Sequence, residues 1–148
     1  MQLTTKSRYA LRALGELAAR GPSKAVSRAQ LARAQGLSAD YMAQLFRSLQ
    51  AAGLVHSVKG PGGGYILARP AAEITVADIV SAVDGPIVFA PCDGVTESCA
   101  RADDSVARLV WHDAAAALTR SLSSWSLEDI ALRLNAAPRP NSIPDEEQ

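Results

Sequence analysis

The chain has 148 residues, 48% of them hydrophobic, which suffices for one cored domain with an appendage and excludes a disordered chain. No run approaches the roughly 18 uninterrupted apolar residues of a membrane span, and the polar first residues lack the apolar stretch of a secretory signal. Cys92 and Cys99 are the only cysteines, too few for a secreted disulfide scaffold. These features predict a cytoplasmic protein.

The formal net charge of zero conceals two halves of opposite sign. Residues 1–70 contain ten Lys or Arg against two acidic residues, a formal charge of +8. Residues 71–148 contain five Arg against thirteen acidic residues, a formal charge of −8. A basic half of this density can bind a polyanion through phosphate contacts. Judged by the charge alone, a basic surface that only contacts solvent is an equally good interpretation.

Two helices are predicted at the start of the basic half. Apolar residues recur at helical spacing over residues 7–20, and Gly21 with the following proline ends this helix. Residues 26–36 begin with a capping box. The Ser27 hydroxyl can accept a hydrogen bond from the Gln30 amide, and the Gln30 side chain can accept one from the Ser27 amide. The sequence therefore predicts a second, short helix.

A third helix is predicted over residues 39–52. Ser38 stands at its N-cap position, and Gly53 stands where its C-terminus is expected. Two short helices joined by a tight turn are typical of a helix-turn-helix. The buried face of the third helix is predicted to consist of Met42, Leu45, Phe46 and Leu49.

The next stretch, SVKGPGGGY at residues 57–65, lies between two β-capable runs, residues 54–58 and 65–68. A phosphate-binding loop of the Walker type needs a lysine after its glycines and then a helix, whereas Lys59 precedes the glycines and a strand-like run follows them. The glycines instead favour the positive φ angles of a hairpin. A helix-turn-helix followed by a hairpin predicts a mainly α winged helix with a two-stranded wing.

The candidate DNA contacts lie on the third predicted helix and on the hairpin. Gln pairs with adenine and Arg with guanine, while hydroxyl groups and a lysine at the base of a wing can reach phosphates. The alternative for Gln44 and Arg47 is that they only solvate the helix. The predicted DNA-binding residues are Ser38, Tyr41, Ala43, Gln44, Arg47, Lys59, Gly60, Gly62 and Gly63.

The acidic half predicts three further helices. Residues 74–86 give a short connecting helix, capped by Thr75 with Asp78 three residues later. Residues 103–123 give a long helix, and residues 124–134 give a short last one, capped by Ser126 with Asp129. The long helix has a broad apolar face that has little left to pack against in a small domain, so pairing with a second copy is expected. The alternative is that this face packs onto the chain's own winged domain. This face consists of Val106, Leu109, Val110, Ala114, Ala117, Leu118 and Leu122.

The predicted organisation has four parts. Residues 1–70 form the winged helix-turn-helix domain, and residues 71–102 form the connecting helix and a cysteine loop. Residues 103–135 contain the dimerisation helix and the short last helix. Residues 136–148, rich in proline and acidic residues, form a disordered tail.

Four stretches together resemble the IscR-like family of bacterial winged-helix regulators. They are MQLTTKSRYALRALGELA, LSADYMAQLFRSLQAAGLV, SVKGPGGGYILARP and EITVADIVSAVDGP, and the resemblance extends over residues 1–129. It implies a homodimer that binds operator DNA as a transcription regulator, and we expect a repressor. It also implies an iron-sulfur cluster in many members. Several relatives carry glutamate at the position of Ala43, so a more permissive operator preference is expected here.

The cluster ligands implied by this resemblance are incomplete. Relatives that bind a cluster typically carry three cysteines and one other ligand between the connecting helix and the long helix. Cys92 and Cys99 match the first two, but Ser105 stands at the third position and Arg108 where some relatives have histidine. Some relatives take an acidic ligand from the partner's first helix, where this chain has Arg8.

Three interpretations of the cysteine pair remain. Cys92 and Cys99 could be metal ligands for an iron-sulfur cluster, assisted by ligands other than cysteine. They could form a thiol-disulfide switch, since six intervening residues allow the Cα separation of about 5.5 Å that a disulfide needs. They could be inert thiols in a regulator without a cofactor. The assisting ligands would come from Asp103, Asp104, Ser105 or His112.

Other classes of function are less consistent with the sequence. No arrangement of nucleophile, base and orienting group is recognisable, so the chain is not expected to be an enzyme. A winged helix can also act as a protein-interaction module, in which case the basic half would meet an acidic partner and bind duplex DNA weakly, without sequence preference.

Overall fold

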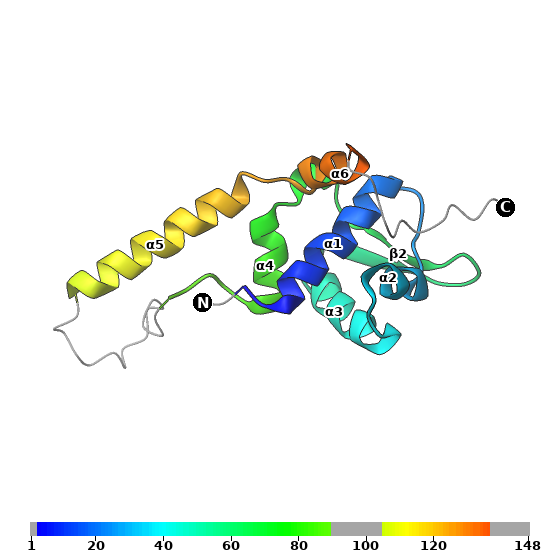
Figure 1. Ribbon diagram of the computed structural model, residues 1–148, viewed down its shortest axis with the longest axis horizontal. Coiled ribbons are helices and arrows are strands. Elements are labelled where there is room, and N and C mark those ends of the chain that lie inside the picture. The colour runs from blue at the N-terminus through cyan, green and yellow to red at the C-terminus, as the bar shows by residue number, and fades with distance from the viewer. Residues whose placement is uncertain (1–2, 90–104, 137–148) are drawn as a thin grey trace.

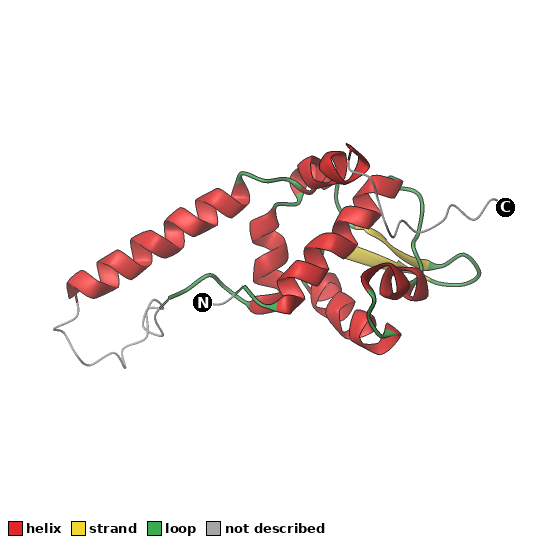
Figure 2. Ribbon diagram, in the orientation of Figure 1, coloured by secondary structure: helices red, strands yellow, loops and turns green. Residues whose placement is uncertain are grey.

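The computed structural model describes residues 3–89 and 105–136, and the structural statements that follow concern these residues. The described part is mainly helical with one two-stranded sheet (Figures 1 and 2). The elements in chain order are α1 (Thr5–Arg20), α2 (Arg28–Gln35), α3 (Ala39–Ala51), β1 (Val55–Val58), β2 (Gly64–Leu67), the 3-10 helix η1 (Ala71–Glu73), α4 (Val76–Asp84), α5 (Ser105–Ser123) and α6 (Leu127–Ala136).

Local capping signals place the helix ends, as predicted. The Gln30 amide donates to Ser27 Oγ at 3.1 Å and the Ser27 amide donates to Gln30 Oε1 at 2.9 Å, which completes the capping box of α2. Equivalent reciprocal bonds begin α4 and α6. Helix α1 begins two residues earlier than predicted, because Thr4 caps it by accepting from the Lys6 amide.

The hairpin is held to the helix-turn-helix by a contact that the sequence analysis did not anticipate. Strands β1 and β2 pair antiparallel, with Val55 opposite Leu67 and Val58 opposite Gly64. Val26, just before α2, forms a bridge with Tyr65, with N–H···O distances of 3.0 and 2.9 Å. This isolated bridge fixes β2 against the start of α2.

The wing tip is a tight turn whose glycines serve two different purposes. The Gly63 amide donates to the Gly60 carbonyl at 3.0 Å, and Gly62 has φ +71°, as expected for a turn with Pro61 at its second position. The prediction that these glycines supply positive φ is wrong for Gly63, which is not among the positive-φ residues. A Cβ at Gly63 would lie 2.4 Å from the Val58 carbonyl oxygen, so this position needs glycine for space.

One hydrophobic core joins elements from both halves of the sequence. Leu14 of α1, Phe46 of α3, Ile79 of α4 and Leu127 of α6 belong to the same buried cluster. Helix α6 lies along α1, and close approach is possible because Gly15 has no side chain facing α6. The core of the winged domain therefore includes residues beyond position 70.

Helix α5 leaves this body and extends away from it (Figure 1). Its C-terminal half packs against α4 through Ala115, which is 8% exposed, and through the half-buried Leu118 and Leu122. The predicted apolar face is divided, because Val106 and Leu109 in the other half remain 73% and 68% exposed. No helix in the described ranges has the length and apolar character needed to cross a membrane.

Candidate nucleic-acid interface

Helix α3 presents two of the predicted base-reading residues on one exposed face. Gln44 and Arg47 are three residues apart and therefore neighbours on the helix surface. Both are exposed, whereas Leu45 and Phe46 face the core. An amide and a guanidinium presented in this way can donate to or accept from base edges in a major groove.

The start of α3 is held in a fixed position. Ser38 Oγ accepts from the Tyr41 amide at 3.1 Å, which caps the helix. The Tyr41 ring meets the ring of Tyr9 from α1 edge to face, with 6.2 Å between centroids. Ala43 is half-buried beside Gln44 and contributes only a methyl group. The first turn of α3 therefore packs against α1 through these two rings.

The wing is fixed relative to α3 by an aromatic contact. The Tyr65 ring of β2 packs against the Phe46 ring of α3, with 4.3 Å between centroids. Lys59 follows β1 directly and is exposed, as are Gly60 and Gly62, whereas Gly63 is half-buried. The structure therefore places all nine predicted DNA-contact residues on α3, its cap and the wing, and connects these elements through the core.

A groove that the sequence analysis missed lies beside the wing. It has a volume of about 650 Å³ and is bordered by the α1–α2 turn, α2 and the wing tip. We call it the basic groove because Arg20, Lys24 and Arg33 line it. The sequence does show that no acidic residue lies between Glu16 and Asp40. It does not show that the basic side chains of this stretch lie beside the wing, because that depends on the fold.

Most of the predicted cofactor ligands lie outside the described residues. This applies to Cys92, Cys99, Asp103 and Asp104, and α5 begins at Ser105, whose side chain is not described. His112 is exposed on α5, and so is Arg108, one turn earlier. Within the described ranges, no three His, Cys, Asp or Glu side chains are grouped so that they could hold a metal ion.

Asp84 anchors the end of α4 to the start of α1. Its carboxylate accepts from the Thr4 amide at 3.2 Å and from the hydroxyl groups of Thr4 and Ser7. Burial opposes ionisation of Asp84, but the hydrogen bonds from Ser7 and Thr4 outweigh it and lower the pKa of this carboxyl group. The anchor is therefore charged at neutral pH, and it immediately precedes the segment that carries Cys92 and Cys99.

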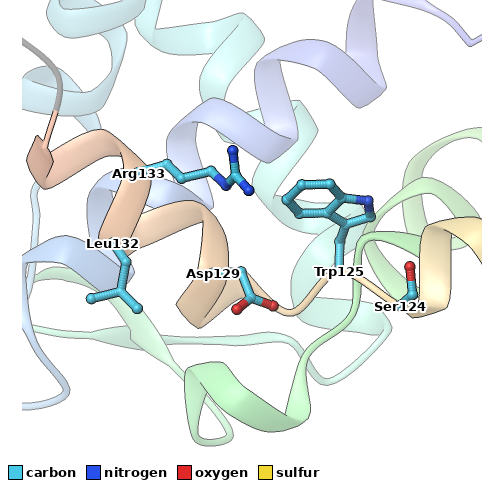
Figure 3. Close-up of a pocket in the computed structure, with 5 residues that line it drawn as sticks. All are labelled: Ser124, Trp125, Asp129, Leu132 and Arg133. Carbon is cyan, nitrogen blue, oxygen red and sulfur yellow. The ribbon is translucent and has the colours of Figure 1, made fainter.

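A second pocket, of about 450 Å³, lies where α5 meets α6 (Figure 3). The Arg133 guanidinium lies over the Trp125 ring, 4.7 Å from its centroid, and Leu132 is exposed at the rim. Asp129 accepts from the backbone and hydroxyl of Ser126, so its carboxylate serves as a helix cap, and these bonds lower its pKa. Helices α6 and α3 lie on opposite sides of α1, so this pocket is not part of the α3 surface (Figure 1).

Helices α2 and α3, the tight turn between them and the antiparallel wing define a winged helix-turn-helix, a class of DNA-binding fold. The fold class expected from the sequence is thereby confirmed. The chain belongs to the Rrf2 family, described as iron-dependent transcriptional regulators, which it matches over residues 3–133.

Individual relatives agree with this assignment. The chain is 41% identical over 130 residues to the HTH-type transcriptional regulator IscR of Photorhabdus laumondii, covering 88% of this chain and 79% of that protein. It is 37% identical over 145 residues to IscR of Pectobacterium atrosepticum, covering 96% and 88%. The expected IscR-like relationship is confirmed, and the chain is a DNA-binding transcriptional regulator.

Solved structures show the same fold. CymR (YrzC), the global cysteine regulator of B. subtilis, superposes with a TM-score of 0.73 at 33% identity, covering 90% of this chain and 98% of that one. IscR of T. potens gives a TM-score of 0.70 at 34% identity, covering 93% and 89%.

Proposed function

We propose that the protein is a homodimeric repressor that blocks transcription by occupying operator DNA. In this proposal α3 of each protomer enters the major groove, and the wing lies along the flanking minor groove or backbone. Gln44 and Arg47 read base edges, and Lys59 contacts a phosphate. The packing of Phe46 of α3 against Tyr65 of the wing supports this arrangement, because it holds both elements side by side where they can engage one duplex together.

The exposed half of α5 is the observation that carries the dimer. Val106, Leu109 and Val110 are 73%, 68% and 55% exposed in the single chain, and Trp111 beside them is also exposed. Soluble monomers rarely leave a contiguous apolar patch of this kind uncovered. A second copy related by a two-fold axis would cover it and would set two α3 helices about 34 Å apart, one turn of DNA.

The proposed signal acts through Cys92 and Cys99. Their segment connects the Asp84 anchor, which holds α4 to α1, with α5, which carries the proposed dimer surface. A peroxide would oxidise the two thiols to one disulfide. The two protons and two electrons that the thiols release would reduce the peroxide. In this proposal the bond changes the spacing of the two α3 helices, because the two thiols lie in the chain between α4 and the proposed dimer surface on α5.

An iron-sulfur cluster held by one chain would need ligands beyond the two thiols. Such clusters are held mostly by cysteine thiolates, usually four, and this chain has two, so histidine or carboxylate groups would have to supply the rest. Arg108 cannot ligate because a guanidinium remains protonated and has no lone pair to offer. We therefore expect protein purified without oxygen to be colourless and free of iron, and DNA binding to respond to peroxide. Visible absorption with bound iron would assign these thiols to a cluster instead.

DNA binding is tested by comparing three variants in anisotropy titrations at several salt concentrations. Lys59→Ala should weaken binding to cognate and random duplexes equally and reduce the salt slope by about 0.9, because one phosphate contact is lost. Gln44→Ala and Arg47→Ala should instead cost about 1–3 kcal/mol on cognate DNA only, which is the discrimination of a bidentate base contact.

Wild-type protein provides the reference for these titrations. If it binds duplex DNA weakly and without sequence preference at low salt, the winged helix serves a protein partner instead. Equal losses for Gln44→Ala on cognate and random DNA would contradict base reading at that position.

A further inference from the structure

The basic groove separates the wing tip from α2 and the α1–α2 turn. Gly60, Gly62 and Gly63 form its wing side, and Ser27, Ala29 and Gln30 contribute to the α2 side. The three cationic side chains, those of Arg20, Lys24 and Arg33, all come from the α1–α2 side. The groove therefore has a charged wall and a wall without side chains.

The side chains that line the groove contribute positive charge and no negative charge. None of the described residues that line the groove is acidic. Lys24 and Arg33 are both exposed to solvent at the border of the groove. A Cβ placed at Gly60 or Gly62 would meet no atom within 4 Å, so the glycine wall borders open space and a ligand can approach the backbone there.

The position of the groove follows from how a winged helix meets duplex DNA. The reading helix occupies the major groove and the wing lies at the adjacent minor groove. A single sugar-phosphate strand separates these two grooves of the duplex, so it must pass between the helix-turn-helix and the wing. The basic groove is the gap between α2 and the wing tip, and its cations have the charge that a phosphodiester strand requires.

We propose that the basic groove seats this sugar-phosphate strand, with Lys24 and Arg33 as its phosphate contacts. The inference rests on the proposed function, since it requires α3 and the wing to engage one duplex. It adds the α1–α2 turn and α2 to the DNA-binding surface, beyond the residues of α3 and the wing. Contacts of this kind carry no sequence information and fix the register of the protein on the duplex.

The experiment measures the salt dependence of binding for Lys24→Ala, Arg33→Ala and the double variant, on a cognate and a random duplex. Each single variant should reduce the salt slope by about 0.9, and the double variant by about 1.8, with equal loss of affinity on both duplexes. Arg120→Ala is the matched control because it removes the same charge from an exposed site on α5, away from the groove. Thermal unfolding of each variant identifies any loss of folding.

The outcomes separate this inference from the function on which it rests. If wild-type protein binds the cognate duplex with a salt slope and the groove variants behave as Arg120→Ala does, the strand does not lie in the groove, and the regulator assignment stands. A loss confined to cognate DNA would also overturn the inference, since it indicates base reading. If inorganic phosphate stabilises wild-type protein but not Arg33→Ala, while the DNA slopes are unchanged, the groove binds a small anion instead. If wild-type protein binds no duplex, the proposed function itself fails.

Discussion

Replacing Leu109 with aspartate is expected to convert the dimer into monomers and to weaken operator binding by about 100-fold or more. Leu109 is 68% exposed on the half of α5 that has no intrachain cover among the described residues, so the change leaves the core intact. A buried, unpaired carboxylate at the interface would oppose association. Each monomer would then bind only a half-site, and the avidity of two linked reading helices, typically 10²–10⁴, would be lost.

Light scattering coupled to size exclusion measures the mass, and anisotropy measures the affinity. Thr119→Asp is the matched control, because Thr119 is exposed on the same helix but is already polar. This control should remain dimeric and bind the operator normally. A Leu109→Asp protein that stays dimeric at micromolar concentration would place the interface elsewhere.

Replacing Gly64 with alanine is expected to reduce the free energy of unfolding by about 3 kcal/mol or more. Gly64 has φ +156°, a conformation that side chains disfavour, and an added Cβ would lie 2.2 Å from the Val26 carbonyl oxygen. Because this contact is with backbone, no side chain can rotate to relieve it. The bridge between Val26 and Tyr65 would have to separate, which also displaces the wing from α2.

Gly62→Ala provides the comparison for this prediction. Gly62 also has a positive φ, +71°, but a Cβ there meets no atom within 4 Å. Its replacement should therefore cost only the local backbone strain, about 1–2 kcal/mol. Urea unfolding of both variants gives the difference, and equal stabilities would show that the backbone near Val26 can move without cost.

Much of the fold followed from signals that act over a few residues. The capping boxes at Ser27 and Thr75 involve partners three residues apart, so the helix starts could be predicted from spacing alone. The order of two short helices and a glycine-rich hairpin predicted the winged helix in the same way. The start of α1 was missed by two residues, because Thr4 caps it without an acidic or amide partner at the third helical position.

The DNA-contact residues remain a prediction, although their placement was partly foreseeable. Helical periodicity separates Gln44 and Arg47 from the buried face of α3, and the structure has both exposed. Sequence reasoning did not find Lys24 and Arg33, because a groove between the α1–α2 turn and the wing exists only after the bridge from Val26 to Tyr65 forms.

The sequence by itself determined the order of the helices, the capping boxes and the hairpin, because these depend on hydrogen bonds and periodicity between near neighbours. The opposite charges of the two halves follow from composition alone. Only the tertiary structure decided that α6 shares a core with α1, that Asp84 bonds to Ser7 across 77 residues, and that α5 buries Ala115 while leaving Leu109 exposed. Contacts between residues far apart in the chain depend on how whole surfaces pack together. No local pattern encodes which of several apolar faces will be covered by the same chain and which will be left for a partner.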